Sequence, residues 1–171
     1  MTRQSELLLT LSAVLFVLVL GIAILGWGID TGYVLHGWII AIAAGWGAMY
    51  LINRLTDPSP DIPLEYKDDV IKWGVLACFV WGVIGFTIGD LLAWQLAFPS
   101  LNGDMSWSNF GRIRPIHTTS VIFGFGGNAL IATSFYVVQR TSRARLSSET
   151  LPWLVFGGYN LFVVLAVTGY P

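Results

Sequence analysis

The chain has 171 residues, of which 55% are hydrophobic and only 11% are charged. Soluble domains carry about 25% charged residues, so this composition argues against a soluble protein and favours one that crosses a membrane several times. The net charge of −1 gives no reason to expect nucleic-acid binding.

Five apolar runs approach or exceed the roughly 20 residues that a transmembrane helix needs. They cover residues 7–27, 33–52, 73–98, 116–138 and 153–170. The sequence therefore predicts an all-α fold, a polytopic transmembrane bundle of five helices in the lipid bilayer. The single cysteine, Cys78, lies within the third run and is expected to be a small buried apolar side chain.

The positions of the cations predict the orientation of these helices. If the runs alternate between the two sides, seven cations lie on one side and only Arg112 and Arg114 on the other. Cytoplasmic loops carry the excess of Lys and Arg, so the N-terminus is expected in the cytoplasm. Arg112 and Arg114 then oppose the topology signal, which suggests that they have another task.

Three segments are expected along the chain. Residues 1–56 form a two-helix transmembrane extension, residues 57–70 form a cytoplasmic linker rich in proline and aspartate, and residues 71–171 hold three core helices. Small residues at four-residue steps in the first core helix predict a face for close helix packing. These residues are Ala77, Gly85, Gly89, Ala93 and Ala97.

The stretch GRIRPIHTTSVIFGFGGNAL, residues 111–130, places polar residues at the mouth of the fourth apolar run. Pro115 suits the first turn of a helix, where its missing N–H is not needed, so His117 is expected near the helix start. Five residues are expected on the same helical face as His117. They are Ser120, Val121, Gly124, Gly127 and Asn128.

Glycines on this face need an explanation, because each costs about 1 kcal/mol in a helix interior. Close packing against another helix is one explanation. The other is a flat ligand such as haem, with His117 on its iron and Arg112 and Arg114 pairing with its propionates. A hydrogen-bonded histidine beside arginines that reach lipid head groups is the alternative, and the residues alone leave both open.

Residues 110–146, FGRIRPIHTTSVIFGFGGNALIATSFYVVQRTSRARL, resemble the second core helix of the catalytic subunit I of cbb3-type cytochrome c oxidases, the C family of haem-copper oxidases. Residues 70–101, VIKWGVLACFVWGVIGFTIGDLLAWQLAFPSL, are similar to the first core helix of that family. The resemblance covers residues 66–171, and its pattern RPxHT…FGGNAL…YxVQRT is long and specific. The chain thus looks like the N-terminal portion of this subunit.

The resemblance implies that His117 ligates low-spin haem b from one face, with Arg114 and Arg112 near the haem propionates. The helix face that begins at Ser120 and ends at Asn128 would then lie against the haem. The full subunit would also hold a high-spin haem and CuB. It would take electrons from c-type cytochrome subunits, reduce O2 to water and pump protons in a bacterial inner membrane.

That chemistry needs six histidines, two for the low-spin haem, one for the high-spin haem and three for CuB. This chain has two, and His36 lies outside the resemblance, where it is expected to be packed or hydrogen-bonded. We therefore expect a part of a longer or split subunit, inactive alone, that works with the rest of subunit I or a complementary chain.

Other readings stay open. A nitric oxide reductase-like subunit would use the same haem ligand, and a non-catalytic haem-binding or assembly subunit would need no copper site. Asp90, inside the third run, is expected to be either a proton carrier or a protonated, hydrogen-bonded side chain. Gln95 and Asn128 are expected to donate hydrogen bonds between helices.

Overall fold

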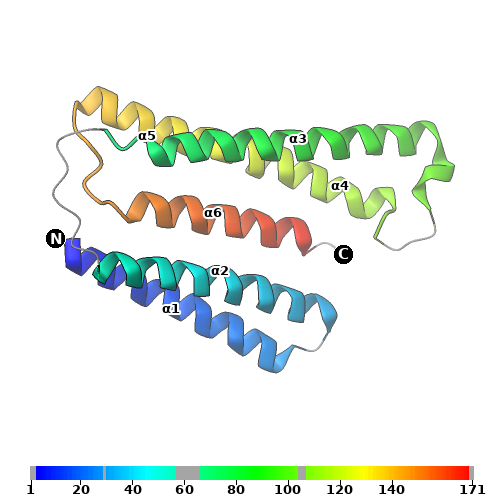
Figure 1. Cartoon of the computed structure of the whole chain (residues 1–171). Helices are drawn as coiled ribbons and strands as arrows, with labels where there is room; N and C mark the ends of the chain where they lie inside the picture. The colour runs from blue at the N-terminus through cyan, green and yellow to red at the C-terminus, as the bar shows by residue number, and fades with distance from the viewer. Residues whose placement is uncertain (1–2, 29, 57–65, 104–106, 170–171) are drawn as a thin grey trace. The chain divides into compact units, whose positions relative to one another are not determined.

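The computed structural model of the chain describes residues 3–28, 30–56, 66–103 and 107–169. Figure 1 shows the helices in chain order. They are α1 (Arg3–Trp27), α2 (Thr31–Thr56), α3 (Asp69–Ala97), the 3-10 turn η1 (Pro99–Asn102), α4 (Phe110–Thr119), η2 (Ser120–Gly127), α5 (Asn128–Ser142) and α6 (Leu151–Thr168).

Five helical stretches are long and apolar enough to cross a membrane, with α4, η2 and α5 forming one of them. They are Gln4–Trp27, Thr31–Thr56, Asp69–Ala97, Phe110–Ser142 and Leu151–Thr168. The predicted all-α bundle of five spans is confirmed. Most of the expected linker, residues 57–65, and the expected end of the last span at Tyr170 lie outside the described residues.

The chain divides into two compact units. Unit 1 comprises Met1–Tyr66 and Arg145–Leu161, and unit 2 comprises Lys67–Ala144 and Phe162–Pro171. The first boundary falls inside the expected linker at 57–70, whereas residues 145–161 group with the N-terminal hairpin. The expected division at residues 56 and 70 stays a prediction.

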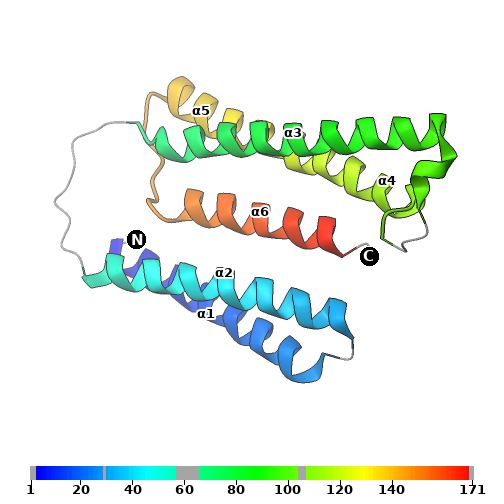
Figure 2. The same ribbon diagram turned by 45° about the vertical axis from the view of Figure 1, so that its right-hand side comes forward.

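In unit 1, α1 and α2 pack as an antiparallel hairpin (Figure 2). Glycine lets their backbones approach, because a Cβ on Gly21 would lie 2.9 Å from the backbone N of Ala41. A Cβ on Gly37 would likewise lie 2.9 Å from the side chain of Leu25. At the connection, Asp30 accepts a hydrogen bond from the backbone N–H of Tyr33 at 2.9 Å and stabilises the start of α2.

In unit 2, α3 packs along its length against α4, η2 and α5. The closest approaches are made at glycines of α3. A Cβ on Gly74 would lie 2.9 Å from that of Ala132, and a Cβ on Gly82 would lie 2.9 Å from the ring of Phe125. Gly85 and Gly89 make equally close contacts further along, so α3 presents its backbone rather than side chains to its neighbour.

The predicted stripe of small residues on α3 is therefore correct only in part. Gly85 and Gly89 lie in the interface, but Ala93 and Ala97 are exposed. The physical reason is the helical repeat of 3.6 residues, because four-residue steps drift by about 40° each around the axis. The interface instead continues through Leu92, which is buried. Cys78 is half-buried rather than buried.

The fourth span begins earlier than the sequence predicts. Asn109 caps α4 by accepting a hydrogen bond from the backbone N–H of Arg112 at 3.0 Å, and the helix starts at Phe110. Pro115 therefore lies inside the helix, in its second turn, and not at its first position. His117 lies in the third turn. The strong asparagine cap outweighs the preference of proline for the helix start.

The same span does not continue as a uniform α-helix. The segment η2 is a π-helix, which is wider and usually confined to single turns at functional sites. Asn128 is 1% exposed and donates from its side-chain amide to the carbonyl of Gly124 at 2.7 Å. This side chain thus satisfies a backbone carbonyl where the regular hydrogen-bond pattern changes.

Two buried amides hold the ends of this helix pair. Near one end, Gln139 accepts from the backbone N–H of Lys67 at 2.8 Å and donates to its carbonyl at 3.3 Å. Next to it, Arg140 pairs with Asp68 at 2.8 Å. Near the other end, Gln95 donates to the carbonyl of Ser108 at 2.7 Å. The two ends are thereby fixed by directional bonds.

We expect the substitution Gln139→Leu to lower the thermal stability of the purified membrane complex. It removes the two hydrogen bonds between the Gln139 amide and the backbone of half-buried Lys67, and each such bond contributes about 1 kcal/mol. The measurement is the midpoint of thermal denaturation. The control is Ser134→Ala, because Ser134 is exposed and bonds only to its own helix. Equal midpoints for the two variants would contradict the role of Gln139.

Candidate functional site

The candidate site is the ring of His117, which α4 presents to the glycine-lined side of α3. Its Nδ1 lies 2.8 Å from the carbonyl oxygen of Gly85. The ring edge lies over Gly89, because a Cβ added there would approach Cε1 of His117 to 2.8 Å and Nδ1 to 3.1 Å. A Cβ at Gly89 would thus occupy the space that the ring takes.

The hydrogen bond to Gly85 decides which ring nitrogen carries the proton. A carbonyl oxygen only accepts, so the proton lies on Nδ1 and the lone pair lies on Nε2. Among the residues that the structure describes, Nε2 has no hydrogen-bond partner. Histidines that bind metals almost always donate their other ring N–H to a carboxylate, a backbone carbonyl or water. The neutral ring of His117 with its proton on Nδ1 matches the arrangement of histidines that bind a metal through Nε2.

The two arginines before His117 differ in their placement. Arg114 precedes the histidine by three residues, so both side chains lie on neighbouring parts of one helical face. Arg112 precedes it by five residues and lies further around the helix. Both are exposed. Within the described part of the chain, the Arg114 guanidinium has no ion pair, which leaves it available to an anion.

The helix face expected to lie against a haem is covered by α3. Ser120 is fully buried, and its Cβ and the side chain of Val121 lie against Gly85. A Cβ on Gly124 would lie 2.7 Å from the ring of Trp81. Asn128 is buried and Gly127 is half-buried. Of the two explanations for these glycines, close helix packing is the one that the geometry favours.

The remaining candidates show ordinary structural contacts. His36 Nδ1 lies 2.8 Å from the carbonyl of Gly32 in its own helix, so the expected hydrogen bond is confirmed. Gln95 donates a hydrogen bond, but to the carbonyl of Ser108 in the turn before α4 and not to another helix. The bond of Asn128 to Gly124 lies within its own span. Asp90 is exposed on α3. No group of three or more His, Cys, Asp or Glu that could hold a metal occurs among the described residues.

The two residues that position His117 were not predicted as part of its site. The sequence identified Gly85 and Gly89 as packing residues, but it gave no sign that one offers a carbonyl to His117 and the other makes room for the ring. A glycine carries no side-chain signal of a hydrogen bond. Only the register between α3 and α4, which is a tertiary property, reveals the link.

The fold and this site define an integral membrane protein with a histidine presented from one of its spanning helices. The family described as "Cytochrome C and Quinol oxidase polypeptide I" matches residues 69–171, which include α3 and the whole span that carries His117. The chain belongs to this family, as the resemblance implied.

Curated relatives point to the same family. The chain is 51% identical over 146 residues to the cytochrome c oxidase subunit 1 homolog of Agrobacterium tumefaciens, covering 82% of this chain and 27% of that protein. It is 48% identical over 144 residues to cytochrome c oxidase subunit 1 of Rhodobacter capsulatus, covering 82% of this chain and 27% of that protein. It is 44% identical over 106 residues to the cbb3-type cytochrome c oxidase subunit CcoN1 of Stutzerimonas stutzeri, covering 62% of this chain and 22% of that protein.

The extent of these matches adds two facts. The chain spans about a quarter of the length of these relatives. The matches with the Agrobacterium and Rhodobacter proteins also cover more of this chain than residues 57–171 contain, so they reach back into the two-helix segment at 1–56. The expectation that this segment lies outside the resemblance is wrong for these two relatives.

Proposed function

We propose that this chain is the N-terminal part of the catalytic subunit of a cbb3-type cytochrome c oxidase, and that His117 is one axial ligand of its low-spin haem b. The observation that carries the proposal is the hydrogen bond from Nδ1 of His117 to the carbonyl of Gly85. It supports ligation because it leaves the Nε2 lone pair to a metal.

The residues at the site fit a haem in their chemistry. A neutral imidazole nitrogen is an established axial ligand of haem iron. Arg114 supplies a guanidinium on the His117 side of α4, suited to a propionate carboxylate. Arg112 is a second, more distant candidate. The haem contacts expected for Ser120, Val121, Gly124 and Asn128 are not part of this proposal, because α3 covers that face.

The neighbours of His117 tune the ligand. The Gly85 carbonyl accepts a hydrogen bond from Nδ1–H, which raises the basicity of Nε2 and fixes the plane of the ring. Gly89 supports the ring without a side chain that would displace it. When bound, the haem supplies one-electron transfer. The role of this chain is to hold that redox centre in a fixed orientation within the membrane.

The wider activity belongs to the whole subunit and complex. We propose that the complex passes electrons from c-type cytochrome subunits to a high-spin haem and CuB, reduces O2 to water and pumps protons. The ligands of those two centres would come from the rest of subunit I or a complementary chain. Its location would be a bacterial inner membrane, with the N-terminus in the cytoplasm as the cation distribution predicts.

His117→Ala is expected to abolish the low-spin haem b signal, because iron loses an axial ligand. The measurement is a reduced-minus-oxidised optical spectrum of the membrane complex purified through this chain. His36→Ala is the matched control, since His36 is the other histidine of the chain and bonds to the carbonyl of Gly32 in its own helix. A low-spin b-type band of normal intensity in the His117 variant would refute the ligand assignment.

Arg114→Gln is expected to leave the haem bound and to lower its reduction potential, on the order of tens of millivolts. A cation near the ring favours the reduced form, so its removal favours the oxidised form. The measurement is a redox titration of the low-spin b-type band. Arg112→Gln should give the smaller shift, because Arg112 lies further around α4 from His117. An unchanged reduction potential in the Arg114 variant would contradict the assignment of Arg114 to a haem propionate.

Gly89→Ala is expected to reduce the haem b content partly and to shift its absorption band. The added methyl would lie 2.8 Å from Cε1 of His117, so the ring must tilt and its bond to Gly85 must lengthen. Gly126→Ala is the matched control within an adjacent helix, because its Cβ has room at 3.7 Å from the nearest atom. Identical spectra in both variants would show that Gly89 does not position the ligand.

A further inference from the structure

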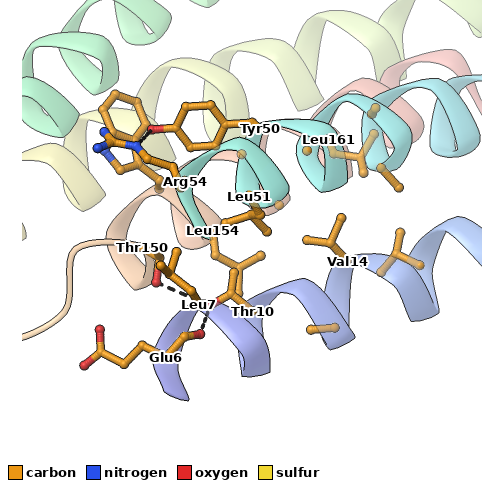
Figure 3. A pocket seen from close by; sticks show the side chains of 18 of the residues that line it. Glu6, Leu7, Thr10, Val14, Tyr50, Leu51, Arg54, Thr150, Leu154 and Leu161 are labelled. Atoms are coloured by element: carbon orange, nitrogen blue, oxygen red, sulfur yellow. Dashed lines mark hydrogen bonds between the residues drawn. The ribbon is translucent and has the colours of Figure 1, made fainter. Parts of the chain in front are cut away.

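Unit 1 contains a cavity of about 340 Å³ that opens between α1, α2 and the first part of α6 (Figure 3). Most of its wall is apolar and comes from membrane-spanning segments. The apolar lining includes Leu7, Val14, Ala44, Gly47, Leu154 and Gly158. We call this cavity the hairpin groove.

Glycines on two walls of the hairpin groove border open space. A Cβ on Gly157 or Gly158 of α6 would meet no atom within 4 Å. A Cβ on Gly47 of α2 would find its nearest atom at 3.5 Å, in the side chain of Val14. These positions contrast with Gly21 and Gly37, where the hairpin packs tightly. The groove is therefore open space between the packed α1–α2 hairpin and the first part of α6.

One end of the groove is polar and carries both signs of charge. Figure 3 shows Arg54 beside Tyr50 on α2, and Glu6 on α1 near the paired hydroxyls of Thr10 and Thr150. Arg54 donates to the Tyr50 hydroxyl at 3.1 Å, and the two threonine oxygens lie 3.3 Å apart. Glu6 has no ion pair among the described residues. These groups lie where α1 begins and α2 ends, at one surface of the membrane.

The lining of the groove suits an amphipathic molecule. The space has about 340 Å³, an apolar wall and a few polar groups at one end. An extended hydrocarbon chain is thin and fits a narrow apolar space. Small-molecule sites of about 300–1,000 Å³ with few polar groups have this character.

We propose that the hairpin groove binds one phosphatidylethanolamine molecule. One acyl chain lies along the glycines of α2 and α6. The phosphate lies toward the Arg54 guanidinium, and the ammonium group lies toward the Glu6 carboxylate. The lining contains a second carboxylate, Glu149, which already pairs with Arg145 at 3.4 Å. The polar end is thus balanced in charge and complements a zwitterionic head group better than an anionic one.

The head group determines which lipid is retained. An acyl chain is as well solvated by the bilayer as by an apolar groove, so tail burial gives little preference for one lipid class over another. A primary ammonium donates hydrogen bonds to a carboxylate, whereas a trimethylated choline has no N–H to donate. The Glu6 carboxylate therefore selects ethanolamine over choline, and Arg54 binds the phosphate that both share.

The test is the lipid content of the full membrane complex, purified in mild detergent and quantified by class with mass spectrometry. The wild type should retain about one phosphatidylethanolamine per chain. Arg54→Gln should lower the retained amount about tenfold, as expected for the loss of a charge-assisted contact. Glu6→Gln should lower the preference for phosphatidylethanolamine over added phosphatidylcholine. Gly158→Leu should block the acyl chain and release the lipid.

Two matched controls separate this effect from misfolding. Gly26→Leu places the same side chain at a glycine that also has open space but does not line the groove. Lys72→Gln removes an exposed cation elsewhere. Both should keep the lipid, and all variants should keep the b-type spectrum of the wild type. The proposal would be overturned if the wild type retained an anionic lipid instead of phosphatidylethanolamine. It would also be overturned if Gly158→Leu retained as much lipid as the wild type, or if that variant alone failed to assemble.

Discussion

The close approach of α3 to the span that carries His117 is the constraint on which unit 2 depends. Helices in a membrane gain little from excluding lipid, so they associate through van der Waals contact and hydrogen bonds. Gly74, Gly82, Gly85 and Gly89 bring the α3 backbone within reach of the neighbouring helix. The hydrogen bond to His117 is a direct consequence, because a side chain at Gly85 would push Val121 away and withdraw the carbonyl from the ring.

Directional bonds then fix how far the two helices slide along each other. Contacts at glycines alone would let α3 slide along the neighbouring span, because a helix surface without side chains offers similar packing at many positions. The buried amides of Gln95 and Gln139 lie near opposite ends of α3 and bond to backbone groups. A slide by one residue would break both sets of bonds. The placement of His117 over Gly89 is therefore determined from the two ends of the helix pair.

The sequence predicts the spans well and their internal details poorly. Hydropathy depends on composition over some 20 residues, so local errors average out, and all five spans appear where they were expected. The start of α4 depends on one competition, between the Asn109 cap and the preference of Pro115 for the first turn, and the cap prevails. The π-helix η2 has no periodic signal in the sequence, and neither has the side-chain bond from Asn128 to Gly124 at its end. The motif singles out His117 as a candidate ligand. Its partners Gly85 and Gly89 can be identified only from the register between α3 and α4.

The polar side chains discussed above fall into two groups, according to whether hydrogen bonds within the protein compensate for their burial. Gln95, Gln139 and Asn128 are deeply buried and bond to backbone groups, which makes them structural. His117 and Arg114 instead each keep a group without a partner among the described residues. The proposed haem would account for both groups, because its iron would take the lone pair and its propionates would pair with the guanidinium. The glycines of the same helix need no such ligand, because α3 covers them.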